Sequence, residues 1–237
     1  MNGRVLVMCA TRSRPQELQK MIDSVARTTT QADVAFYVDE DQRDQYAGTK
    51  GRYRAFMGPR KGPCASLNIM ANDMRGYDAY GAMTDDGIFE TPGWDRWVIK
   101  TAAEFKSGIG AIAPQTVGGV TERMDFPWLT GKWIEAAGSF VPPLMDTYHF
   151  SWDVGLQLVG ESTQIKFARE SEFAISHAEM HPPRTFPGEL GVLPEPQTDY
   201  GIRVLYAFAD GKEVCRWIAV DMRHMIKTLK DAIAEGS

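Results

Sequence analysis

The chain has 237 residues, of which 43% are hydrophobic and 24% charged, and this balance excludes an intrinsically disordered protein. Its formal net charge of −5 excludes a global basic field that would recruit nucleic acid. One local basic cluster is either a solvated loop or a track for phosphates: Arg52, Arg54, Arg60 and Lys61.

The three cysteines are too few and too far apart for a disulfide framework or a paired-cysteine metal site. Reduced thiols favour the cytoplasm. The only apolar run near the N-terminus covers residues 5–10, which is too short for a signal peptide or a membrane span. The sequence therefore predicts a cytoplasmic protein.

Strands and helices alternate in the N-terminal half. Apolar runs predict buried strands at residues 5–10, 34–38, 52–57, 79–83 and 109–113. Helical spacing predicts one helix that follows a Ser13 cap, one over 63–74 and one that opens at Thr91-Pro92. This alternation predicts an α/β fold with an open, mostly parallel twisted sheet flanked by helices.

The pattern changes after about residue 114, where glycine and proline pairs separate shorter elements. Spacing predicts a helix over 148–159 and a strand over 163–168. A C-terminal helix over 213–234 should dock on the body or on another subunit. We expect one compact domain.

Polar residues follow three of the predicted strands. They are Thr11-Arg12-Ser13-Arg14 after the first, Asp39-Glu40-Asp41 after the second and Thr84-Asp85-Asp86-Gly87 after the fourth. Ligands of open α/β sheets bind outside the carboxyl ends of the strands, so these groups should form a site. The Asp85-Asp86 pair would either bind a divalent cation that bridges phosphates or form a turn, which Gly87 permits. Neither a Rossmann glycine fingerprint nor a P-loop is present.

An ordered set of segments over about residues 4–200 resembles glycosyltransferase family 2 and related GT-A enzymes. Its centre is Gly62-Pro-Cys-Ala-Ser-Leu-Asn68 followed by Tyr77-Asp-Ala-Tyr-Gly-Ala-Met-Thr-Asp-Asp-Gly-Ile-Phe89. The segment from Thr11 to Pro15, the strand that ends in Asp39, and Gly138-Ser-Phe-Val-Pro-Pro143 followed by Trp152-Asp153 are also similar. The fuller family motif reads Asp-x-Asp-Asp, and Met83 stands at its first position here.

The resemblance implies a metal-dependent, inverting glycosyltransferase that uses a nucleoside-diphosphate sugar, UDP-linked in our interpretation. Asp39 would accept the uracil N3–H and Asp85 would bind the ribose hydroxyls. The full set of nucleotide-binding residues would be Thr11, Arg12, Arg14, Asp39, Lys61, Asn68 and Asp85.

The same resemblance implies a Mn²⁺ or Mg²⁺ ion bound by Asp86 and a histidine. We prefer His177, which lies just after the apolar run over 173–175, and His181 is the alternative. Asp153 would be the catalytic base, unless it lies on a solvated helix face.

The resemblance also divides the domain into a nucleotide-sugar-binding half over 1–114, an acceptor-binding half over 115–200 and a C-terminal helical extension over 201–237. The acceptor would be a glycan, a protein or a modified DNA base. The protein itself would be either a monomer or a homo-oligomer. Three tryptophans either line the acceptor groove or pack in the core: Trp128, Trp133 and Trp152.

Two other functions share this pattern. A sugar-nucleotide pyrophosphorylase has the same type of sheet, but the glycine-rich loop and lysine that usually follow its first strand are missing from this sequence. A non-catalytic nucleotide- or glycan-binding protein of the same fold is the third interpretation.

Overall fold

A seven-stranded sheet forms the centre of the computed structural model, which describes residues 3–29, 31–119, 122, 124–142, 152–177 and 213–236. The strand order is β3-β2-β1-β4-β8-β6-β9. The strands are β1 (Val5–Thr11), β2 (Ala32–Asp39), β3 (Arg54–Gly58), β4 (Ala79–Met83), β6 (Ala111–Ala113), β8 (Trp128–Thr130) and β9 (Ile165–Phe167). Only β8 runs antiparallel to its neighbours, β4 and β6. The predicted open, mostly parallel sheet is confirmed.

Three short strands make a second sheet in the order β5-β10-β7. They are β5 (Gly87–Phe89), β7 (Gln115–Thr116) and β10 (Ala174–His177). β10 lies antiparallel to β5 and parallel to β7. This sheet therefore brings the end of β10 next to the turn that follows β4.

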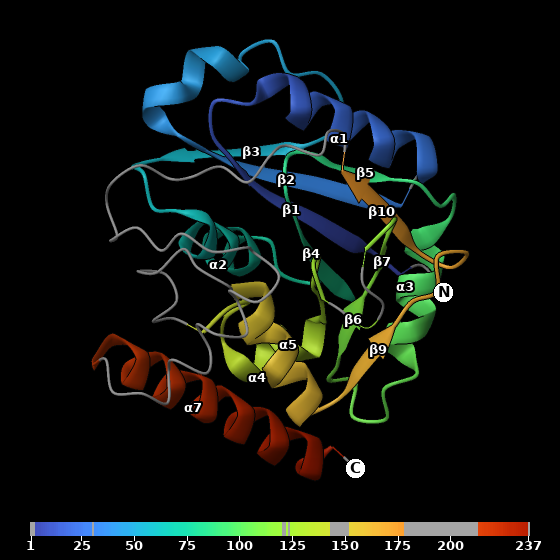
Figure 1. The fold of residues 1–237 in the computed structure, drawn as a ribbon, viewed down its shortest axis with the longest axis vertical. Coiled ribbons are helices and arrows are strands. Elements are labelled where there is room, and N and C mark those ends of the chain that lie inside the picture. The colour runs from blue at the N-terminus through green and yellow to red at the C-terminus, as the bar shows by residue number, and fades with distance from the viewer. Residues whose placement is uncertain are drawn as a thin grey trace.

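Helices cover both faces of the main sheet (Figure 1). Val5, Val7 and Cys9 of β1 pack in a core with α1 (Pro15–Thr28) and α3 (Trp94–Ala103). Leu6 and Met8 alternate to the opposite face, as a strand requires. That face is covered by α2 (Pro63–Asp73), α4 (Gly131–Ala137), α5 (Trp152–Ser162) and α7 (Glu213–Glu235).

The C-terminal helix α7 docks on the body of its own chain. It contacts α4 and α5 (Figure 1), and its Leu229 is fully buried. This confirms the first of the two docking sites that we expected. No helix in the described ranges has the length and apolar character needed to cross a membrane.

The predicted helix starts need correction at two places. Arg14, and not Ser13, is the N-cap of α1, because Pro15 occupies the first helical position and Ser13 has a left-handed φ of 58°. The third helix begins at Trp94 rather than at Thr91-Pro92, because Gly93 precedes it with a left-handed φ of 75°. Residues 148–151, where we placed the start of α5, lie outside the described residues.

Candidate active site

Three neighbouring parallel strands deliver the predicted polar residues to one edge of the sheet. β1 lies between β2 and β4 and is parallel to both. Thr11 ends β1 and Asp39 ends β2, while Asp85 and Asp86 follow β4 directly. All four residues are therefore close in space, although 28 to 75 positions separate those of different strands. The predicted clustering at this edge is confirmed.

A tight turn carries the two aspartates. The Gly87 N–H donates to the Thr84 carbonyl oxygen at 3.1 Å, which closes a four-residue turn. Gly87 then begins β5, and His177 on β10 is the residue paired with it. The pairing places His177 Nδ1 3.6 Å from Asp86 Oδ1. The structure thus brings together the two residues that we predicted as metal ligands.

Asp85 is buried and has partners for both carboxylate oxygens. Arg14 Nη1 lies 2.5 Å from Oδ1, and the Thr11 hydroxyl donates to Oδ2 at 2.8 Å. Burial raises the pKa of Asp85, and the Arg14 charge and the Thr11 hydroxyl act against that rise. Three of the predicted nucleotide-binding residues therefore form one hydrogen-bonded group.

Asp86 lies between a cation and an imidazole. Its Oδ2 is 3.2 Å from Arg14 Nη2, while its Oδ1 faces His177. Burial alone would raise the pKa of Asp86, but His177, Thr84 and Arg14 outweigh that effect and hold the pKa well below its usual range. In turn, the Asp86 carboxylate raises the pKa of His177 against the effect of burial. Asp86 is thus ionised at neutral pH, as a metal ligand must be.

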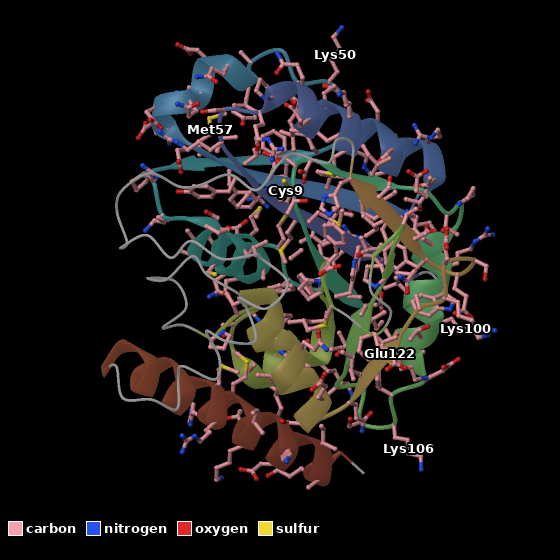
Figure 2. The ribbon with its side chains drawn as sticks, viewed as in Figure 1. Cys9, Lys50, Met57, Lys100, Lys106 and Glu122 are labelled. Carbon is pink, nitrogen blue, oxygen red and sulfur yellow. The ribbon has the colours of Figure 1, made fainter. Side chains whose placement is uncertain are left out.

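Asp85 is buried and Asp86 is half-buried, which is uncommon for charged side chains. Lys50, Lys100 and Lys106 point outward, whereas Cys9, on the strand that leads to the site, lies in the interior (Figure 2). Buried charges need partners or ligands because desolvation disfavours them. Paired carboxylates with shifted pKa values at a sheet edge are typical of functional sites.

Arg12 and Asp39 also meet at this edge. The Arg12 guanidinium donates to Asp39, and it makes two further bonds to Asp41 at 2.7 and 3.0 Å. Asp39 is buried and Asp41 is exposed. The carboxylate that we predicted to read the base is therefore paired with an arginine from the β1–α1 loop.

Lys61 and Asn68 lie further along the chain, before and within α2. Lys61 is exposed, and its neighbour Arg60 lines an open depression with Glu40, Asp41 and Pro59. Asn68 is buried, and its side chain bonds to the backbone of Phe140 and Val141 at 2.9 to 3.2 Å. These bonds give Asn68 a structural role, and its predicted contact with a nucleotide stays a prediction.

The acceptor-side predictions are only partly described. Asp153 is the second residue of α5, but its side chain lies outside the described part of the structure, as do the side chain of Trp152 and all of His181. Trp128 and Trp133 are fully buried in the core, so they do not line an acceptor groove. The predicted base therefore stays a prediction.

Sequence reasoning missed two aromatic residues of the site. Tyr46 ends the 3₁₀ helix η1 (Glu40–Tyr46), and its hydroxyl bonds to Thr11 Oγ1 at 2.9 Å and accepts the Arg14 N–H at 3.1 Å. Phe126 packs its ring 5.3 Å from the His177 ring. The only signal for Tyr46 was its place shortly after the acidic cluster that closes β2, and Phe126 gave none.

The fold is that of the GT-A glycosyltransferases, and the GT-A fold predicted from the sequence is confirmed. TarS residues 1–349 from S. aureus is 11% identical over 95% of this chain and 69% of that chain, with a TM-score of 0.55. The mannosyltransferase PcManGT from Pyrobaculum calidifontis, in complex with GDP-Man and Mn²⁺, is 13% identical over 98% and 74% of the two chains, with a TM-score of 0.56.

A third similar structure is GalNAc-T7 with UDP, GalNAc and Mn²⁺. It is 9% identical over 73% of this chain and 43% of that chain, with a TM-score of 0.54. No family model matches the sequence, and no curated protein matches it either. At these identities the similarity establishes the fold, and the function has to be argued from the site.

Proposed function

We propose that this protein is a metal-dependent glycosyltransferase that takes a sugar from a nucleoside-diphosphate donor at the edge formed by β1, β2 and β4. The observation that carries the proposal is the pair of Asp86, directly after β4, and His177, at the end of β10, whose Oδ1 and Nδ1 atoms lie 3.6 Å apart. The GT-A fold supports it, as do the Mn²⁺ ions of two proteins with similar structures.

The residues present fit a divalent cation. Two ligand atoms that bind one such ion at about 2.1 Å and at right angles lie about 3 Å apart, so the Asp86 to His177 separation needs only a small adjustment. Among the described residues no cluster of three His, Cys, Asp or Glu side chains could hold a metal. The protein would supply two ligands, with phosphate oxygens and water completing the shell. An imidazole ligand favours Mn²⁺ over Mg²⁺.

The remaining site residues would bind different parts of the donor. Asp39 would bind the base and Asp85 the ribose, while Thr11 and Arg12 would line the nucleotide and Arg14 would contact the diphosphate. A bound divalent cation acts as a Lewis acid that neutralises a departing diphosphate. Our preferred donor is UDP-linked, because a carboxylate accepts the uracil N3–H. The guanine N1–H would suit Asp39 equally, whereas cytosine offers no N–H at that position.

Inversion with Asp153 as base is the finer part of the proposal. The acceptor hydroxyl must lose a proton as it attacks the sugar, which calls for a positioned carboxylate. Asp153 lies at the start of α5, on the side of the chain that we assign to the acceptor. The acceptor would be a glycan, a protein or a modified DNA base.

Thermal unfolding with nucleotides tests the proposal. UDP should raise the melting temperature with Mn²⁺ and not with a chelator, because a ligand that binds the native state stabilises it. Asp86→Ala should abolish the metal-dependent part. The matched control, Asp44→Ala, removes an exposed carboxylate of η1 and should leave the shift intact.

Four outcomes test these assignments and decide between the functions. Equal stabilisation by UDP with and without metal would refute the metal assignment, and stronger binding of GDP or CDP than of UDP would refute the choice of base. Slow release of UDP from a UDP-sugar separates a transferase from a binding protein. Formation of a UDP-sugar from UTP and a sugar phosphate would instead indicate a pyrophosphorylase.

A further inference from the structure

Arg14 occupies the position between the two aspartates of the site. Its Nη1 is 2.5 Å from Asp85 and its Nη2 is 3.2 Å from Asp86, and only 17% of its side chain is exposed. Burial alone would lower the pKa of Arg14, but Asp85 and Asp86 outweigh it and raise the pKa. The site therefore contains a permanent internal cation.

The Arg14 guanidinium contacts one carboxylate oxygen of Asp86, the residue that we assign as a metal ligand. Asp86 directs Oδ1 to His177 and Oδ2 to Arg14. A divalent ion next to Asp86 would lie close to the guanidinium, and like charges at short range in a partly buried site repel strongly. Arg14 also neutralises one of the two negative charges that would attract the ion.

The two contacts of Arg14 are unequal. The contact with Asp86 is longer by 0.7 Å than the contact with Asp85, from 3.2 and 2.5 Å. Asp85 is also the more buried carboxylate, and Thr11 fixes its other oxygen. Asp86 is thus the partner that Arg14 can give up at lower cost. A diphosphate offers a replacement, since guanidinium groups bind phosphate oxygens with paired hydrogen bonds.

We propose that Arg14 is a resident counter-cation of Asp86 that opposes divalent-cation binding until a nucleoside diphosphate takes over the guanidinium. The inference rests on the proposed function for the identity of the nucleotide. Metal and nucleotide binding are then coupled through Arg14, and the coupling is reciprocal. The free protein binds Mn²⁺ weakly, and the nucleotide complex binds it tightly.

The test measures Mn²⁺ binding to the free protein, without nucleotide or sugar, from the loss of the electron paramagnetic resonance signal of aqueous Mn²⁺. Arg14→Gln should tighten the Mn²⁺ dissociation constant roughly 5- to 150-fold, the usual range of coupling between two sites. Arg14→Lys should give a smaller gain, because an ammonium group cannot bridge both carboxylates as the guanidinium does. Arg43→Gln, which removes an exposed arginine of η1, should change nothing.

The same measurement with saturating UDP completes the test. The added UDP should tighten Mn²⁺ binding much less in Arg14→Gln than in the unmodified protein. Unchanged or weaker Mn²⁺ binding by Arg14→Gln overturns the inference, and so does an absence of Mn²⁺ binding in all variants. If Arg14→Gln does not fold, Arg14→Lys decides: Mn²⁺ binding no tighter than that of the unmodified protein overturns it.

The inference and the proposed function fail separately. If Arg14→Gln tightens Mn²⁺ binding but no nucleotide binds, Arg14 is confirmed as a counter-cation and the proposed function is wrong. If the protein transfers a sugar while Arg14→Gln leaves Mn²⁺ binding unchanged, the inference alone is wrong.

Discussion

Asn68→Ala separates a structural role of this residue from the nucleotide contact that the sequence suggests. The Asn68 Oδ1 accepts the N–H groups of Phe140 and Val141 at 2.9 and 3.0 Å, and its Nδ2 donates to the Val141 carbonyl at 3.2 Å. These bonds join α2 to a segment 72 residues further along the chain. Alanine at position 68 removes these three hydrogen bonds at once.

The expected loss follows from the groups left without partners. Each buried backbone group without a hydrogen bond costs about 1–3 kcal/mol. Entry of water into the vacated space lowers the total, so we expect a loss of about 3–4 kcal/mol in the free energy of unfolding. For a chain of this size that loss lowers the melting temperature by roughly 6–16 °C.

The assay is urea unfolding of Asn68→Ala beside Asn72→Ala, with UDP-induced stabilisation measured on both. Asn72 is an exposed asparagine near the end of the same helix whose side chain bonds to the exposed Arg75, so its loss should stay within about 0.5 kcal/mol. If Asn68→Ala is as stable as the control but no longer responds to UDP, the structural reasoning is refuted and Asn68 binds the nucleotide.

Two further predictions concern catalysis and stability. Asp153→Asn should lower turnover about a hundredfold or more while donor affinity changes little, and normal turnover or a product that keeps the anomeric configuration of the donor would exclude an inverting base at this position. Asp33 accepts bonds from Arg4 and Tyr77 at 2.7 and 2.9 Å, and although burial favours its neutral form, these partners lower its pKa. A carboxyl group whose pKa is lowered in the folded state stabilises the fold at pH values above its unfolded-state pKa. Asp33→Asn should therefore lower the free energy of unfolding by about 1–2 kcal/mol at pH 7. The difference in stability between the variant and the unmodified protein should shrink below about pH 4. A loss in urea unfolding that is independent of pH would contradict this.

Elements with long apolar runs could be predicted from the sequence, because burial on both faces leaves a local signal. β1, β2 and β4 are each five or more residues long, and each was expected at its observed place. β5, β7 and β8 have two or three residues, too few for a period to be visible. β5 depends on β10, whose residues lie some 87 positions later, and such pairing leaves no trace in a short window.

The same distinction holds for the site. The positions of Thr11, Asp39 and Asp85 follow from the rule that ligands bind at the carboxyl ends of parallel strands. The contacts of Arg14 do not follow from this rule, because tertiary geometry and charge determine which groups a flexible loop side chain contacts. The family resemblance suggested a nucleotide contact for Arg14, but the ion pairs with both aspartates needed the structure.

The loop between β1 and α1 supplies side chains to both ends of the proposed donor site. Arg12 and Arg14 stand two positions apart, and Ser13 between them has a left-handed backbone. Arg12 pairs with Asp39 after β2, whereas Arg14 pairs with Asp85 and Asp86 after β4. Because β1 lies between β2 and β4, a loop that leaves β1 can reach both sides. A nucleotide that binds Asp39 through its base and reaches Asp86 through its phosphates must therefore rearrange two ion pairs of this one loop, so base recognition and metal binding should be energetically coupled.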